Sequence, residues 1–136
     1  MWTLSGINWV SILIATVVVM VIGWAWYSDM LFGKDWLGMI GKSKDDLKKN
    51  AGMGYGGALV LTVVTATVLA LLIKALGIHG YLEGAKLGVL IWLGFIATTT
   101  GVGMLFEGSR KKLWLINNGN QLVNLIVIGA IIAGMG

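Results

Sequence analysis

Long apolar runs, separated by short polar connections, dominate the pattern of hydrophobic and polar positions along this chain. Four of them approach the roughly 20 residues that a helix needs to cross the hydrocarbon core of a bilayer. They cover about 7–27, 55–76, 87–106 and 113–135, and Lys74 is the only charged residue inside them. A backbone in lipid must satisfy its own polar groups, so each run is predicted to be helical. The pattern therefore predicts an all-α, polytopic membrane protein, a four-transmembrane-helix bundle.

Composition supports this prediction. The chain has 136 residues, of which 57% are hydrophobic and 12% are charged, whereas a soluble domain carries roughly 45–50% apolar and about 25% charged residues. A single domain of this length cannot hide the surplus in its own core, so the lipid bilayer is the expected partner. The chain has no cysteine and one histidine, which excludes disulfides and His/Cys metal clusters. We expect no metal and no cofactor.

The basic residues predict an orientation. Eight of them lie in two connections, after the first and third spans: Lys34, Lys42, Lys44, Lys48, Lys49, Arg110, Lys111 and Lys112. The opposite side carries only Lys74 and Lys86. The excess of positive charge on cytoplasmic loops predicts N-out and C-out topology in the cell (inner or plasma) membrane. The net charge of +4 then indicates contact with anionic headgroups at the cytoplasmic loops, and no nucleic acid is expected.

The first cytoplasmic loop, residues 28–54, is the longest connection. Ser43 followed by Asp46 resembles a capping box, with an aspartate in place of the usual Glu or Gln. It predicts a short amphipathic helix that ends near Lys48 or Asn50 and rests on the membrane. A solvated turn with scattered charges is the alternative, and the sequence leaves both open.

The ends of the first and third spans share a motif. Residues 29–37 and 103–115 both contain Met-Leu-Phe, then glycine, a basic residue and Trp-Leu. Both pairs of spans would cross the membrane in the same order, which is the pattern of a parallel repeat. This similarity predicts a bundle built of two similar helical hairpins. Three pairs also have the small-xxx-small spacing of close helix contacts: Gly52/Gly56, Gly84/Gly88 and Gly129/Ala133.

Two longer strings resemble a known family. WYSDMLFGKDW and LFEGSRKKLWLINNGNQLV, with the acidic segment at 45–49 and the stretch at 93–99, are similar to the bacterial and fungal membrane family catalogued as domain of unknown function 1761. The resemblance covers nearly the whole chain. The family often has proline where this chain has Asp29. The resemblance implies four spans but brings no established activity, so it assigns no catalytic residue.

Polar residues on the fourth span form the best candidate site. The amides at 117, 120, 121 and 124 are spaced i, i+3, i+4 and i+7, which puts them on one helical stripe. Three threonines lie at similar depth in the third span. The set is Asn117, Asn120, Gln121, Asn124, Thr98, Thr99 and Thr100. Interhelical hydrogen bonding is the plainer interpretation of such amides, and a polar path for a small solute is the functional one.

A second set lies at the cytoplasmic interface, next to the shared motif: Trp26, Tyr27, Asp29, Phe32, Phe106 and Glu107. Its two acids pair with nearby Lys34, Arg110 or Lys111 in the plainer interpretation. In the functional interpretation, they are carboxylates at the mouth of an ion route.

The sequence thus favours an uncharacterised small membrane protein, with a transporter- or channel-like homo-oligomer as the leading hypothesis. The alternative is a structural or accessory protein that binds lipid or a membrane partner and transports nothing. An enzyme is not expected, because no histidine or carboxylate cluster lies within the spans.

Overall fold

The computed structural model describes residues 3–28, 30–49, 51–108 and 110–136, without the side chains of Lys44 and Leu47. The described residues are mostly helical and contain no strand. The elements are α1 (Trp9–Trp26), α2 (Gly33–Ile40), α3 (Lys44–Lys49), α4 (Ala51–Leu76), α5 (Tyr81–Ile91), the π-helix η1 (Trp92–Ala97), α6 (Thr98–Glu107) and α7 (Lys111–Met135). Four stretches are long and apolar enough to span a membrane: α1, α4, the continuous α5–η1–α6 helix, and α7. The prediction of an all-α polytopic protein is confirmed.

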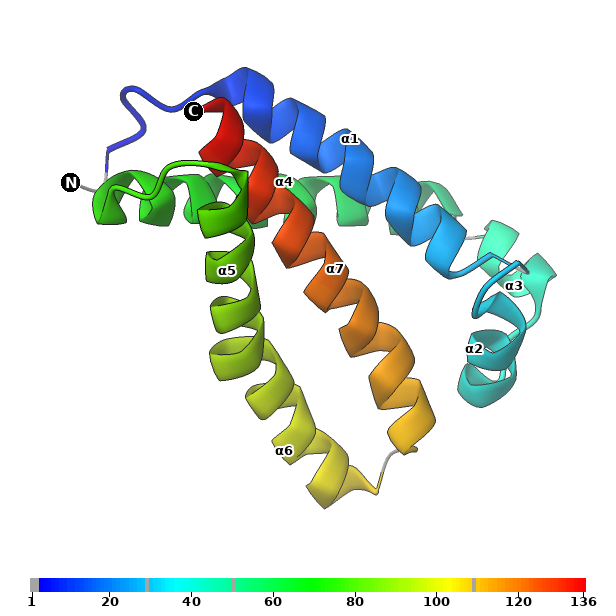
Figure 1. Cartoon of the computed structure of the whole chain (residues 1–136). Coiled ribbons are helices and arrows are strands. Elements are labelled where there is room, and N and C mark those ends of the chain that lie inside the picture. Colours follow the sequence, from blue (N-terminus) through cyan, green and yellow to red (C-terminus); the bar gives the residue numbers. More distant parts are fainter. Residues whose placement is uncertain (1–2, 29, 50, 109) are drawn as a thin grey trace.

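The bundle is closed at one end and splayed at the other. Helix α7 contacts α1, α4 and most extensively α5, while Figure 1 shows α6 diverging from α7 toward the connection that joins them. The buried core lies near the two termini, in α1 as far as Val19, the last half of α4 and the last half of α7. Its residues include Ile12, Ala15, Val19, Ala66, Leu69, Ile73, Leu125, Ile128 and Ile132. We call these two ends the closed end and the open end.

Glycines let α5 and α7 approach each other closely at the closed end. A side chain on Gly84 would collide with the Gly129 carbonyl, and one on Gly88 would collide with the Leu125 carbonyl. Two of the three small-xxx-small pairs from the sequence, Gly84/Gly88 and Gly129/Ala133, therefore meet in one backbone-to-backbone contact. A Cβ on Gly52 or Gly56 would meet nothing within 4 Å.

Hydrogen bonds join the closed end across the helices. The Lys74 ammonium donates to the Ser5 carbonyl, and the Gly80 backbone N–H donates to the Ala133 carbonyl at 3.1 Å. The Asn8 amide donates to the Met135 carbonyl at 3.4 Å, while its oxygen caps α1 by accepting from two backbone N–H groups. These bonds hold the closed end together beyond its apolar packing.

The first connection contains two short helices where the sequence predicted one. The predicted capping box is confirmed: Ser43 N–H donates to Asp46 Oδ2 at 3.0 Å, and Asp46 N–H donates to Ser43 Oγ at 3.2 Å. It begins α3. Helix α2 was not predicted. It ends at Gly41, which has a positive φ of 70°, and it reaches α7 through Asp35, whose Oδ2 lies 3.2 Å from Lys112 Nζ.

The two hairpins are antiparallel but pack differently. Helices α5 and α7 touch through glycine backbones, whereas α1 and α4 meet through the side chains of the core cluster. The second hairpin also contains η1, where six residues take the wider π-helical form before α6 diverges. Such π segments frequently accompany functional sites.

Candidate functional site

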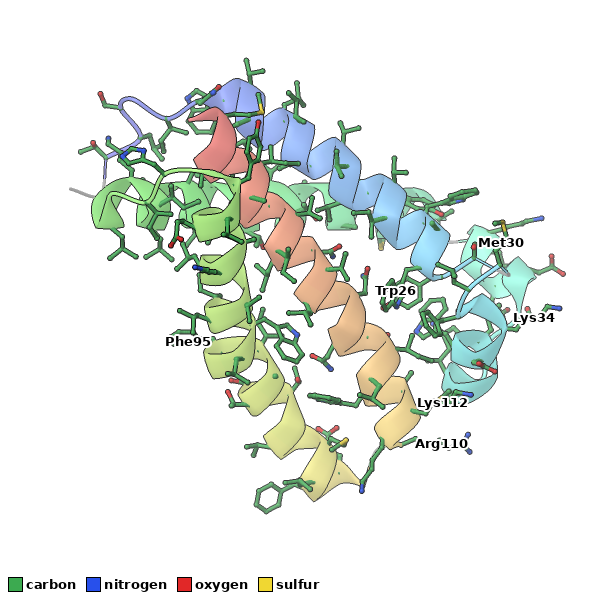
Figure 2. All side chains as sticks on the ribbon, viewed as in Figure 1. Trp26, Met30, Lys34, Phe95, Arg110 and Lys112 are labelled. Carbon is green, nitrogen blue, oxygen red and sulfur yellow. The ribbon has the colours of Figure 1, made fainter. Side chains whose placement is uncertain are left out.

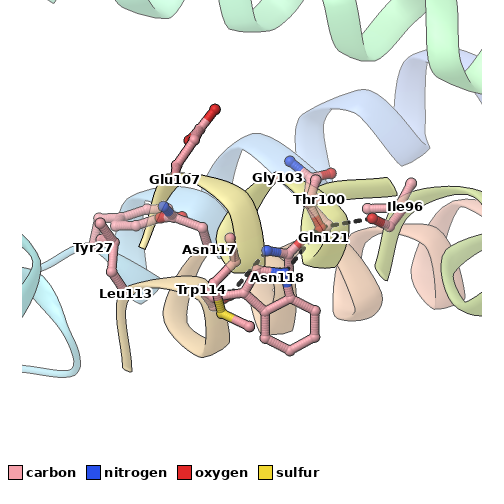
Figure 3. A pocket seen from close by; sticks show the side chains of 11 residues that line it. Tyr27, Ile96, Thr100, Gly103, Glu107, Leu113, Trp114, Asn117, Asn118 and Gln121 are labelled. Atoms are coloured by element: carbon pink, nitrogen blue, oxygen red, sulfur yellow. Dashed lines mark hydrogen bonds between the residues drawn. The ribbon is translucent and has the colours of Figure 1, made fainter. Parts of the chain in front are cut away.

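A cleft of about 660 Å³ lies between α6 and α7 at the open end (Figure 3). Polar side chains from three elements line it: Tyr27, which follows α1, Thr100 and Glu107 of α6, and Asn117, Asn118 and Gln121 of α7. The Trp114 indole and several aliphatic groups complete the wall. The cleft thus combines amides, hydroxyls, one carboxylate and aromatic surface.

Asn118 is the best-connected amide of this wall, and sequence reasoning missed it. Its Oδ1 lies 2.9 Å from Thr100 Oγ1, and its Nδ2 donates to the Trp114 carbonyl at 3.0 Å. The indole N–H of Trp92 donates to the Asn118 carbonyl at 2.8 Å. Asn118 lies off the i, i+3 stripe, which is why periodicity did not select it. The available signal was two tryptophans on adjacent spans, since a buried indole N–H needs an acceptor.

The indole rings support the same wall. Trp114 donates its N–H to Thr100 Oγ1 at 3.0 Å, and its ring centroid lies 6.5 Å from that of Trp92. Both rings therefore have their N–H groups bonded to the protein. Thr100 is the one predicted threonine with a hydrogen bond to α7: Thr98 donates to the Gly94 carbonyl of its own helix, and Thr99 is exposed.

The end of α1 is anchored to α7 by the predicted interface motif. Tyr27 Oη donates to Asn117 Oδ1 at 2.8 Å, and Trp26 Nε1 donates to the Ile116 carbonyl at 2.8 Å. Figure 2 shows the Trp26 ring between the two helices, where it faces Gly119. The two hydrogen bonds from Trp26 and Tyr27 to α7 fix one side of the cleft, because Tyr27 and Asn117 both line it.

Two amides of the predicted stripe, Asn120 and Asn124, differ from the others in the surroundings of their side-chain oxygens. The Oδ1 atoms of Asn120 and Asn124 have no partner among the described residues, and Asn120 is only 7% exposed. Gln121, by contrast, is exposed into the cleft. The stripe therefore divides into bonded, buried and cleft-facing amides.

The remaining residues of the predicted interface motif lie in different surroundings. Phe32 packs against Trp26 with ring centroids 5.0 Å apart, whereas Phe106 is 89% exposed. Glu107 lines the cleft. Asp29 lies outside the described residues, so the proposed pair of acids is represented by Glu107 alone.

A second groove of about 380 Å³ lies between α1 and α4. Its walls are almost entirely apolar and include Met20, Val21, Trp24 and Leu59. Nothing in it offers the polar chemistry of the first cleft, and its lining matches the acyl chains of a bilayer.

Comparison with known proteins gives one match. The family model described as "Protein of unknown function (DUF1761)" matches residues 10–133, which include nearly all of the four spans. No curated protein and no solved structure matches the chain. The resemblance seen in the sequence is confirmed by the family match.

Proposed function

This chain belongs to the DUF1761 family of proteins of unknown function, and from the geometry of its cleft we propose that it is a transporter- or channel-like membrane protein for a small polar solute. The observation that carries the proposal is a polar cleft, open at one end of an apolar bundle. Amides are costly against hydrocarbon, so they are expected to face protein or water.

The closed end supports a transport role for this cleft. Beyond the polar residues, α5 and α7 meet at Gly84 and Gly129 with no room for a side chain. Ile128, next to this contact, is 1% exposed. A site that is accessible from one side and sealed on the other is what alternating access requires of each of its states.

The proposed orientation is N-out and C-out in the cell membrane, with the basic connections in the cytoplasm. The cleft then opens toward the cytoplasm, because Glu107 and the first turn of α7 lie at its mouth. Exposed lysines of the first connection meet anionic headgroups. The proposal includes no catalytic step, no cofactor and no nucleic acid.

The proposed working unit is a homo-oligomer. The first half of α4 is exposed along its length: Met53 is 83% and Leu61 is 69% exposed. Four helices that diverge at one end enclose little volume by themselves. A second copy packed against α4 would add helices that surround the open end.

Uptake into liposomes tests the proposal. The purified chain is reconstituted and offered a panel of radiolabelled small solutes that carry positive, negative or no charge. Gln121→Leu is the decisive variant, because Gln121 faces the cleft and makes no side-chain hydrogen bond among the described residues, so the fold is expected to survive. We expect it to reduce uptake at least tenfold. The matched control is Phe95→Leu, since Phe95 points away from the bundle (Figure 2).

Uptake that is unchanged in Gln121→Leu would contradict a path through this cleft. The second candidate function, an accessory protein that binds lipid, is favoured by the apolar groove beside Trp24 and by the exposed lysines. It predicts a co-purifying lipid that is lost when Lys42, Lys48 and Lys49 are replaced by Gln.

A further inference from the structure

Several hydrogen-bond donors of the cleft wall are already engaged by the protein. The Tyr27 hydroxyl and the Trp114 indole N–H each donate to a neighbouring side chain, and Asn118 Nδ2 donates to a backbone carbonyl. The N–H groups of Asn117 and Gln121 and the second N–H of the Asn118 amide remain for a ligand. These donors are neutral, and the described lining residues include no cation, so a carboxylate or phosphate finds no opposite charge here.

The same wall carries a negative charge that no cation of the described lining balances. Glu107 is the only charged side chain among the described residues that line the cleft. Behind the lining, the Oδ1 atoms of Asn120 and Asn124 have no donor. A carboxylate accepts hydrogen bonds from a cation and does not donate, so this chemistry favours a ligand that brings N–H groups and positive charge.

Aromatic surface adds to this preference. Tyr27 and Trp114 line the cleft with Glu107 (Figure 3). The Trp114 ring is held by its in-plane N–H bond to Thr100, so its face is the part that remains for a ligand. A cation over the face of a tryptophan or tyrosine is attracted by the negative charge of the π-system.

Resting on the proposed solute-binding role, we propose that the ligand of this cleft is a small organic cation, an alkylammonium or guanidinium compound. Its charged group is held by the Glu107 carboxylate and the faces of Trp114 and Tyr27. Gln121 and Asn117 accept from its remaining N–H groups. The volume of about 660 Å³ is in the usual range for small-molecule sites.

The basic residues near the mouth do not line the cleft. Lys112 pairs with Asp35 of α2 at 3.2 Å, and Arg110 and Lys111 are exposed to solvent. Glu107 is the charged side chain on the cleft wall, so its carboxylate is the charge in direct contact with a ligand there.

Equilibrium dialysis against the chain in nanodiscs of zwitterionic lipid tests the inference. Three probes share one aromatic skeleton: 2-phenylethylammonium, 2-phenylethanol and 3-phenylpropionate. Empty nanodiscs correct for partition into lipid. We expect saturable binding of the ammonium probe, at least tenfold tighter than that of the other two.

Matched variants locate the effect. Glu107→Gln is expected to weaken binding of the ammonium probe at least tenfold. The control is Glu83→Gln, which removes a carboxylate from the opposite end of the same span, where Glu83 pairs with Lys86. It is expected to leave binding unchanged. Trp114→Phe, which keeps an aromatic face, is expected to retain binding within about threefold.

Three results would overturn the inference. One is equal affinity for the ammonium probe in wild type and Glu107→Gln. Another is that the alcohol or the anion binds more tightly than the ammonium probe, and that Gln121→Leu abolishes this binding. That result would refute a cationic ligand but keep the cleft as a binding site. The third is saturable binding of none of the probes; uptake in liposomes then decides separately whether the proposed function also fails.

Discussion

Asn117, Asn118 and Asn120 of α7 carry the same amide group in three different environments. Asn117 accepts from Tyr27, Asn118 bonds to Thr100 and to the Trp114 carbonyl, and the Oδ1 of Asn120 is buried without a partner. A bonded amide and an unbonded buried amide contribute to stability with opposite sign. These residues therefore allow a direct comparison on one helix.

Leucine substitutions at Asn118 and Asn120 are expected to have opposite effects. Asn118→Leu removes the bond to Thr100 of α6, and interhelical bonds in membranes are worth about 1 kcal/mol. It also removes the bond to the Trp114 carbonyl within α7, so the free energy of unfolding should fall by about 1–2 kcal/mol. Asn120→Leu removes a buried acceptor that has no partner, so it should be neutral or stabilising. Reversible unfolding in mixed micelles measures both. A greater loss in Asn120→Leu than in Asn118→Leu would contradict these environments.

The glycine contact between α5 and α7 gives a second prediction at this scale. In Gly84→Ala the new methyl group meets the backbone carbonyl of Gly129, which cannot move without separating the helices. We expect a loss of about 1–3 kcal/mol in unfolding free energy. Gly101→Ala, on the same span, meets nothing within 4 Å and is the control. It should be neutral or gain up to about 1 kcal/mol from helix propensity.

At the scale of elements, α3 depends on the reciprocal bonds between Ser43 and Asp46. The Ser43 backbone N–H and hydroxyl hold the pKa of the Asp46 carboxyl below its ordinary value. A carboxylate whose pKa is lower in the folded loop than in the unfolded chain stabilises that loop above its ordinary pKa. This contribution is lost as pH falls through the lowered value.

We therefore expect α3 to fray on acidification before the spans change. The protection factors of two amides measure this between neutral pH and the acidic range: Ser43 N–H, which donates to the Asp46 carboxylate, and Asp46 N–H, which donates to Ser43 Oγ. Ser43→Ala should raise exchange already at neutral pH, because the cap is gone. A protection factor of the wild-type Ser43 amide that stays constant through the acidic range would show that the Asp46 carboxylate does not hold the cap.

Some of the helices could be predicted from the sequence and others could not. The spans follow from hydrophobic length, and α3 follows from Ser43 and Asp46. Helix α2 has no side-chain cap, since it follows Phe32 without a capping bond, and it depends on tertiary contacts such as the Tyr27–Trp36 ring pair at 4.7 Å. The π-helical form of η1 is invisible in an apolar run, because periodicity carries no signal where nearly every residue is hydrophobic.

At the scale of the whole molecule, the site depends on which helices separate and where. The sequence places amides on α7, but the cleft arises because α6 diverges beyond the Gly84 and Gly88 contact. Asn118 became visible as a site residue only through its bonds to Thr100 and Trp92 across that space. Hydrogen bonds between helices depend on the tertiary fold, so the spacing of residues along a single helix does not predict them.

Cysteine accessibility across the membrane tests the central claim most directly, that Gln121 lines a water-filled cleft open at the basic end. The chain has no native cysteine, so single variants need no background. Gln121→Cys, Phe95→Cys and Ile128→Cys are treated with a membrane-impermeant maleimide from either side of oriented vesicles. We expect Gln121→Cys to react faster from the side of the basic connections than from the other side, and the lipid-facing and core positions not to react. A Gln121→Cys variant as inert as Phe95→Cys, or one that reacts only from the opposite side, would contradict the account.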